Sequence, residues 1–203
     1  MRTTRTAALG ASMAASPASY VPVVRVVAGS ARGIRLDAPP GNATRPTSDR
    51  VREATFNALG SLGLIEGAEV LDLFAGSGAM GIEALSRGAA RATFVDNDRA
   101  AVDAIRANLA RTKLDGVGSV VRADAVRFAA EQANGFDLAV LDPPYAFNGW
   151  EALLASLPVA VAVIESDRAI DPGPSWTVVR SRRYGTTVVT ISRSLDDHEE
   201  TPP

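Results

Sequence analysis

The sequence contains no cysteine and only one histidine, and both scarcities exclude kinds of site. Without cysteine the chain can form no disulfide, no thiolate zinc site and no cysteine nucleophile. The single histidine, His198, lies among acidic residues close to the end of the sequence. A histidine-based catalytic triad or a histidine-rich metal site is therefore not expected, and we predict that the protein needs no metal.

Long apolar runs are also missing, because no stretch of the sequence is apolar over the length that spans a bilayer. Within the first twenty residues, Leu9 and Met13 are isolated among small residues, whereas a secretory signal needs a continuous apolar centre. We interpret residues 1–20 as a disordered leader and expect a cytoplasmic protein that does not associate with membranes.

Lysine is scarce, since Lys113 is the only lysine among 21 basic residues, and the net charge is −2. A chain with this balance is not globally basic, so nucleic-acid binding would have to come from a local patch. Residues 195–203 are rich in Asp and Glu, and we interpret them as a disordered acidic tail.

The chain has 203 residues, enough for one good core with a small appendage. From residue 69 onward, strand and helix patterns alternate, which is typical of an α/β fold with a mostly parallel sheet. The expected strands cover residues 69–74, 91–96, 117–122, 136–141 and 159–165, and the expected helices cover 79–87, 98–112, 124–133 and 149–156. Segments 175–183 and 185–193 predict an antiparallel hairpin at the sheet edge.

The region before residue 63 has a different pattern. Residues 21–38 predict two short strands joined by a glycine-containing turn. Thr47 or Ser48 can cap a helix that runs to about Leu62. We therefore expect a small hairpin-and-helix extension, residues 21–62, ahead of the α/β domain at 63–194.

A glycine-rich loop follows the first strand of the α/β region. Residues 75–81 read Ala-Gly-Ser-Gly-Ala-Met-Gly, which matches G-x-G-x-x-G between a strand and a helix. Asp96 follows Gly76 by twenty residues, at the end of the next strand, where an acid binds a ribose hydroxyl. The motif predicts an adenosine-type cofactor, either S-adenosylmethionine or NAD.

Two acids favour S-adenosylmethionine. Asp72, inside the first strand, would be badly placed beside a pyrophosphate but suits the ammonium of an amino-acid moiety. Asp124, after the third strand, can reach an adenine amine. The alternatives stay open: Asp72 as a buried acid satisfied by backbone N–H groups, and Asp124 and Asp98 as helix N-caps.

The tetrapeptide Asp142-Pro143-Pro144-Tyr145 follows a buried strand, at the sheet edge where α/β proteins bind ligands. Prolines fix the backbone and remove N–H donors, so nearby carbonyls stay available as acceptors. Asp142 and the Pro143 carbonyl could hold both hydrogens of an –NH₂ group, and Tyr145 could stack on a base. The alternative is an ordinary strand-ending turn.

These motifs together resemble class I S-adenosylmethionine-dependent methyltransferases that act on exocyclic amines. Two further segments, residues 28–36 (Ala-Gly-Ser-Ala-Arg-Gly-Ile-Arg-Leu) and 45–53 (Arg-Pro-Thr-Ser-Asp-Arg-Val-Arg-Glu), are similar to the RsmD family of bacterial 16S rRNA guanine-N2 methyltransferases. The similarity covers about residues 23–193. Asp96 stands where many members of the family carry Glu, a change that should preserve ribose binding.

The resemblance implies a Rossmann-like fold with a mostly parallel seven-stranded sheet, a C-terminal antiparallel hairpin and the N-terminal extension. It implies catalysis by Asp142, Pro143 and Tyr145. It also implies S-adenosylmethionine contacts from Asp72, Phe74, Ala75, Gly76, Ser77, Gly78, Asp96, Asn97, Asp124, Ala125 and Asp142. The implied substrate is one guanine of 16S rRNA, in the assembling or assembled small ribosomal subunit.

RNA binding is expected from the extension, where six arginines stand against Asp37 and Asp49. They are Arg25, Arg32, Arg35, Arg45, Arg50 and Arg52. A solvated basic face is the alternative for these residues, and an edge-strand charge row is the alternative for Arg180, Arg182 and Arg183. We expect the protein to act as a monomer.

Three competing functions remain. An exocyclic-amine methyltransferase of DNA adenine or cytosine would typically carry a separate target-recognition region, and little chain lies outside the predicted sheet. An NAD-dependent oxidoreductase would explain the glycine loop but leave residues 142–145 unused. A catalytically inactive RNA-binding scaffold is disfavoured by the intact tetrapeptide.

Overall fold

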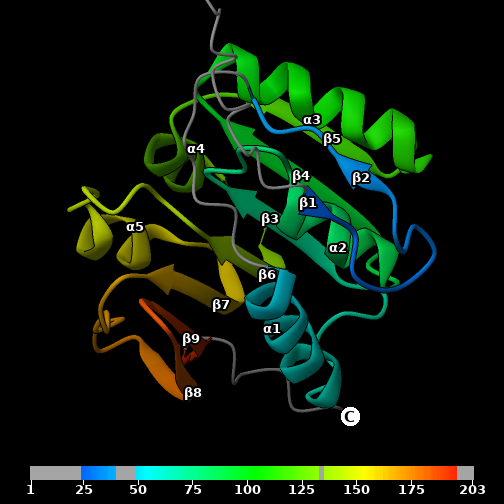
Figure 1. Ribbon diagram of the computed structural model, residues 1–203. Coiled ribbons are helices and arrows are strands. Elements are labelled where there is room, and N and C mark those ends of the chain that lie inside the picture. The colour runs from blue at the N-terminus through cyan, green and yellow to red at the C-terminus, as the bar shows by residue number, and fades with distance from the viewer. Residues whose placement is uncertain (1–23, 40–48, 133–134, 196–203) are drawn as a thin grey trace, which may run out of the picture.

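The computed structural model describes residues 24–39, 49–132 and 135–195, and these form a seven-stranded sheet in the order β5-β4-β3-β6-β7-β9-β8 (Figure 1). Five strands pair in parallel: β5 (Gly118–Arg122), β4 (Arg91–Asp96), β3 (Glu69–Leu73), β6 (Phe136–Leu141) and β7 (Val159–Ser166). The sheet is completed by an antiparallel hairpin of β9 (Thr187–Ser194) and β8 (Trp176–Tyr184). The predicted α/β fold with its C-terminal hairpin is confirmed.

Helices cover both faces of this sheet (Figure 1). One hydrophobic cluster includes residues of α1 (Asp49–Ser61), α2 (Ala79–Ser86) and α3 (Arg99–Thr112). A second cluster, on the opposite face, includes residues of α4 (Ala125–Glu131) and α5 (Trp150–Ser156). Successive residues of β3 divide between them: Val70 belongs to the first cluster, while Leu71 and Leu73 belong to the second.

The central strands are apolar almost throughout because both of their faces are covered. In β6, Leu138, Ala139, Val140 and Leu141 are all fully buried. The predicted strands and helices of the α/β region are therefore confirmed, with ends that differ from the expected ones by at most two residues. Among the residues that the structure describes, no helix combines the length and apolarity needed to cross a membrane.

The order of the strands creates a switch point beside β3. From β3 the chain builds outward to β4 and β5, and then returns to the other side of β3 with β6. The loops that follow β3 and β6 therefore leave the sheet in divergent directions, and α/β proteins bind ligands in the crevice between such loops. These are the glycine loop and the loop that begins with Asp142.

The N-terminal extension packs on the face of the sheet that carries α2 and α3 (Figure 1). Its predicted hairpin is confirmed as β1 (Val24–Arg25) and β2 (Arg35–Leu36), which pair antiparallel. Val24, Leu36 and Phe56 belong to the same hydrophobic cluster as Ile82 of α2, so the boundary predicted at residue 62 does not separate two cores. The predicted leader, the Thr47 and Ser48 caps and nearly all of the acidic tail lie outside the described residues.

Candidate active site

The glycine loop joins β3 to α2 through three residues in the left-handed conformation. Phe74, Gly76 and Gly78 have φ angles of 60°, 56° and 75°. Phe74 is the unusual member, because a side chain in this conformation is strained, and such strain is concentrated at functional sites. The Phe74 ring packs edge-on against Phe147, with the ring centroids 5.2 Å apart.

The third glycine of the motif allows α2 to approach the sheet closely. A Cβ atom on Gly81 would lie 2.3 Å from the Phe94 ring of β4, a distance that real Cβ atoms do not reach. The same residue is also bonded to β3, since its backbone N–H donates to Asp72 Oδ2 at 2.8 Å. The first turn of α2 is thus fixed against both β3 and β4.

Asp96 holds the glycine loop against the end of β4. Its Oδ2 accepts from the Gly76 N–H at 2.8 Å, and its Oδ1 accepts from the Asp98 N–H at 2.9 Å. A carboxylate has about four acceptor positions, so two remain for the hydroxyl groups of a ribose. The predicted ribose contact is compatible with this geometry.

Asp72 is 2% exposed, on the same sheet face as Asp96 and Asp142. Burial raises the pKa of Asp72 well above its ordinary value, while the bond from Gly81 lowers it and the charges of Asp142 and Asp96 raise it further. Like charges that converge in this way disfavour ionisation, and a nearby cation would relieve them. The carboxyl ends of β3, β4 and β6 therefore form a site suited to a positively charged ligand.

The loop after β6 begins with Asp142, which is partly buried, and continues through the buried Pro143 to Pro144 and Tyr145 on the surface. The Phe147 N–H donates to the Pro144 carbonyl at 2.8 Å, which closes the turn. Within the described part of the chain, no hydrogen bond uses the Pro143 carbonyl. Tyr145 is 40% exposed, so its ring can receive a partner.

The predicted adenine-binding residues lie at the ends of two neighbouring strands. Asp124 is the N-cap of α4 and accepts from the Arg127 N–H at 2.9 Å, while Asp98 caps α3 by accepting from Ala100. Both capping alternatives are thus confirmed. The Ala123 N–H donates to the Asp96 carbonyl, which fixes the ends of β5 and β4 together beside Asn97 and the buried Ala125.

A cavity of about 460 Å³ lies at the opposite edge of the sheet. Its lining includes Ala68 and Asp137, which stand at the amino ends of β3 and β6, together with Arg193. Parallel α/β sheets bind their ligands at the carboxyl ends of the strands, and the lining contains none of the predicted site residues. The carboxyl edge is therefore the candidate active site.

Comparison with known proteins identifies the family. The family described as "conserved hypothetical protein 95" matches residues 24–193. YlbH of Bacillus subtilis is 40% identical over 181 residues, which cover 83% of this chain and 97% of YlbH. Ribosomal RNA small subunit methyltransferase D of Escherichia coli is 43% identical over 122 residues, 60% of each chain. The solved structure of yhhF from Escherichia coli superposes with a TM-score of 0.75 at 34% identity, over 85% of this chain and 98% of yhhF.

This chain belongs to the RsmD family. The fold is accordingly that of an α/β, Rossmann-like methyltransferase, and the resemblance seen in the sequence is confirmed. The roles of individual residues are not decided by family membership, so each must be judged from its place in the structure.

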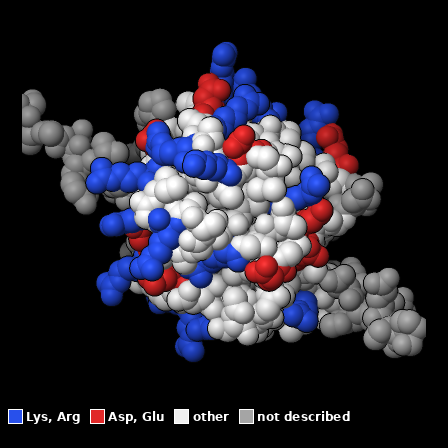
Figure 2. Space-filling model, turned by 90° about the vertical axis from the view of Figure 1, so that its right-hand side faces the viewer, with Lys and Arg blue, Asp and Glu red and all other residues white. Residues whose placement is uncertain are grey.

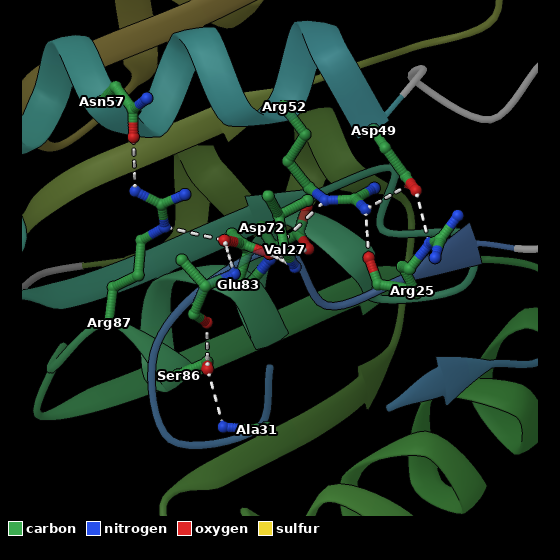
Figure 3. Close-up of polar contacts among 12 residues, drawn as sticks. Arg25, Val27, Ala31, Asp49, Arg52, Asn57, Asp72, Glu83, Ser86 and Arg87 are labelled. Carbon is green, nitrogen blue, oxygen red and sulfur yellow. Dashed lines mark hydrogen bonds and ion pairs between the residues drawn. The ribbon is translucent and has the colours of Figure 1, made fainter. Parts of the chain in front are cut away.

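Among the RNA-binding candidates, the prediction for Arg52 is wrong. Its side chain is 1% exposed and cannot contact RNA in this structure. Its guanidinium lies 2.8 Å from Asp49 and 3.6 Å from Glu83, and it donates to the Arg25 carbonyl (Figure 3). Arg87 completes the cluster with an ion pair of 2.7 Å to Glu83.

The buried Glu83 also holds the extension in place. Its two carboxylate oxygens accept from the Val27 and Ala28 N–H groups at 2.7 and 3.0 Å (Figure 3). One turn later on α2, Ser86 accepts from the Ala31 N–H and donates to the Ala28 carbonyl. The arginine that the sequence assigned to RNA therefore belongs to a structural cluster that fastens the extension to α2.

The remaining arginines of the extension lie on the surface. Arg25 forms an ion pair of 3.1 Å with Asp49, whereas Arg32, Arg35 and Arg50 are exposed, and Arg45 lies outside the described residues. On the side of the molecule drawn in Figure 2, basic side chains are numerous but are interspersed with acidic ones. The RNA contacts predicted for these five residues remain predictions.

Sequence reasoning missed two residues that connect the site. Phe147 lies between Phe74 of the glycine loop and Trp150 of α5, and so links the two active-site loops. Asn108 of α3 is fully buried and donates to the carbonyls of Ser77 and Asp37, each at 2.9 Å, while it accepts from the Asp37 N–H. One amide thereby joins the extension to the glycine loop. Helical spacing could place Asn108 on the inner face of α3, but no local signal names its partners.

Proposed function

We propose that this protein transfers a methyl group from S-adenosylmethionine to the exocyclic N2 amine of a guanine in 16S rRNA. Membership of the RsmD family supports the reaction class, and a relative bears the name of a small-subunit rRNA methyltransferase. The observation that carries the choice of an amine is the Asp142-Pro143 pair of acceptors beside the glycine loop at the switch point. The other candidates, DNA methylation and NAD-dependent oxidation, have no comparable support.

The residues at the carboxyl edge fit the proposed cofactor. Asp96 would hold the ribose, Asp124 the adenine amine and Asp72 the ammonium of the amino-acid moiety. The pKa of Asp72 is raised chiefly by burial and further by the charges of Asp142 and Asp96, and a bound cation would offset both effects. When bound, S-adenosylmethionine supplies an electrophilic methyl group.

Asp142 and Pro143 would prepare the nucleophile. The lone pair of guanine N2 is delocalised into the ring, so the amine is a poor nucleophile until it is held out of plane. The Asp142 carboxylate and the Pro143 carbonyl would accept its two N–H groups and aim the nitrogen, and this orientation supplies most of the rate. As the N–C bond forms and the S–CH₃ bond breaks, the nitrogen would lose one proton, either to Asp142 or to water after the transfer. Tyr145 would stack on the base, which must leave its own stack to enter the site.

Single-stranded RNA is the substrate that this site accepts most easily, because a loop base leaves its stack at lower cost than a base in a duplex. The exposed Arg32, Arg35 and Arg50 of the extension would contact the phosphates around it. We place the reaction on the small ribosomal subunit, assembling or assembled, with the protein acting as a monomer.

The test uses small subunits and protein-free 16S rRNA from a strain that lacks the family's enzyme. Both are incubated with the purified protein and labelled S-adenosylmethionine, and the products are digested to nucleosides for mass spectrometry. We expect N2-methylguanosine at one position of 16S rRNA. Label in adenine or cytosine of a DNA control, or no label in any RNA, would contradict the proposal.

A further inference from the structure

The outer strand of the sheet, β8, carries three exposed arginines in its second half: Arg180, Arg182 and Arg183. In the described part of the chain, none of the three forms an ion pair. Two basic residues of the extension differ in this respect, because Arg25 and Arg52 are both paired with Asp49.

The strand register places these arginines at the active-site edge. Arg182 lies opposite Val189 of β9, and Val189 lies opposite Glu165 of β7. Glu165 follows the pair Leu141–Ile164, which puts it level with Asp142 on the neighbouring strand β6. Arg182 is therefore in the same cross-sheet row as Asp142, at a backbone separation of about 14 Å from three strand spacings of about 4.8 Å.

A β-bulge between Val178 and Arg180 determines which way the side chains point. After the bulge, Arg180 and Arg182 pair with Ile191 and Val189, whose side chains belong to the hydrophobic cluster under α1. Both arginines line a shallow crevice between β8 and α1. Bulges at sheet edges often redirect side chains in this way near functional sites.

Protection of the sheet edge can explain Arg180 but not Arg182 and Arg183. Edge strands often carry charge to prevent pairing with another chain, and such charge would be needed most beside exposed apolar residues. The exposed apolar residues of β8 are Val178 and Val179, which Arg180 directly follows, whereas Arg182 and Arg183 do not adjoin them. These two lie instead in the half that ends at the active-site edge.

We propose that Arg180 and Arg182 on the α1 face of β8, together with Arg183 on its other face, form a second RNA-contact surface along this edge strand, which binds phosphates of the strand that flanks the target nucleotide. The proposal rests on the rRNA methylation proposed above. In the strand order, β8 lies three strands from β6 on one side, whereas the hairpin β1–β2 packs with α2 and α3 over the other side, where β3, β4 and β5 lie (Figure 1). A strand that places one base in the site would thus be held on both sides.

The test compares two double variants that remove the same charge. R182Q/R183Q removes the two arginines nearest the active-site edge. R91Q/R193Q removes two exposed arginines from the opposite edge, where Arg91 begins β4 and Arg193 lies opposite Val161 near the start of β7. Affinity for protein-free 16S rRNA is measured over a range of salt concentrations, and methylation is measured on both rRNA and small subunits.

We expect the log–log salt slope of R182Q/R183Q to be smaller by about 1.4, since each phosphate contact on a single strand contributes about 0.7. Its KM for RNA should rise, while kcat at saturating RNA and the affinity for S-adenosylmethionine stay at the wild-type values. R91Q/R193Q should match the wild type in every measurement. The stronger variant R182E/R183E should extend the loss of affinity in the same direction.

Equal salt slopes and equal KM values for the two double variants would overturn the proposal. A loss confined to small subunits, with normal affinity for protein-free rRNA, would also overturn it and assign the surface to a ribosomal protein instead. A wild-type protein that methylates neither substrate would overturn the proposed function itself, and with it this second surface.

Discussion

Two groups of acidic residues lie on the same face of the sheet, and they are balanced in different ways. Around Glu83, two arginines and two backbone N–H groups converge on one buried carboxylate. At the carboxyl edge, Asp72 and Asp96 accept only from backbone N–H groups in the described part of the chain. In the first group the acidic charge is balanced by arginines of the same chain, although Arg52 Nε, Arg52 Nη1 and Arg87 Nη2 have no hydrogen-bond partner among the described residues; the second group leaves negative charge for a ligand to meet.

The difference separates stability from function. A buried carboxylate that has lost its cations is strongly destabilising, so the Glu83 group is expected to matter mainly for folding. The acids of the carboxyl edge carry a penalty of burial and mutual repulsion in the free protein, which a cationic cofactor would offset on binding. Substitutions in the two groups should therefore affect different measurements.

The largest effect is expected from Glu83→Gln, which removes the counter-charge shared by the buried Arg52, which keeps its ion pair with Asp49, and the partly buried Arg87. The free energy of unfolding should fall by about 3–5 kcal/mol, as when one partner of a buried ion pair is removed. Denaturant unfolding measures this loss. The control is Glu53→Gln on the exposed side of α1, which should change stability by less than about 0.5 kcal/mol. Equal stability of the two variants would show that the buried cluster does not hold the extension.

The next effect concerns catalysis rather than folding. Asp142→Ala should lower the single-turnover methylation rate by about two to three orders of magnitude, because a charge-assisted contact to the reacting amine is lost. Stability and cofactor affinity should change little. Asp115→Ala, at an exposed acid in the loop before β5, provides the control and should react at the wild-type rate. Near-normal rates in Asp142→Ala would remove the role proposed for this residue.

Asp96→Ala should weaken S-adenosylmethionine binding by about 1.5–3 kcal/mol, the contribution of a hydrogen bond to a charged group. Because Asp96 also holds the glycine loop through Gly76, the ribose contact must be separated from the loop contact. Calorimetry with S-adenosylhomocysteine and with an analogue that lacks the ribose hydroxyls completes a double-mutant cycle. The quantity to compare is the loss of affinity on removing the ribose hydroxyls, measured in the wild type and in Asp96→Ala. If this loss is the same in both proteins, Asp96 does not bind the ribose.

The smallest effect is a pH dependence from Asp72. Its pKa is raised in the folded protein, so the folded state keeps a proton that the unfolded state releases above about pH 3.9. Stability should therefore fall as the pH rises from there to the raised pKa, by at most about 1.4 kcal/mol per pH unit. Asp72→Asn should show a flatter dependence over about pH 4–7 in denaturant unfolding, and parallel curves for the two proteins would contradict the assignment.

The glycine loop and the Asp142 loop show how much of the site can be predicted from the sequence alone. Each follows a buried strand, and the apolar pattern of the strand, the glycines and the prolines are all local signals. Parallel strands align their carboxyl ends, so the meeting of Asp72, Asp96 and Asp142 at one edge also follows from the predicted order of elements. The helix caps Asp98 and Asp124 are also predictable from local sequence, because each acid directly precedes the helix that it caps.

Only the tertiary structure decided what each arginine does. In the sequence, Arg50 and Arg52 each stand between Val51 and an acidic residue. Arg50 is exposed, whereas Arg52 is buried because Glu83, 31 residues later, lies under α1 and pairs with it. Arg182 comes to the level of Asp142 through the pairing of β8 with β9 and of β9 with β7. A charge in a sequence shows that a partner is needed, but long-range packing determines whether that partner is an acid of the same chain or a ligand.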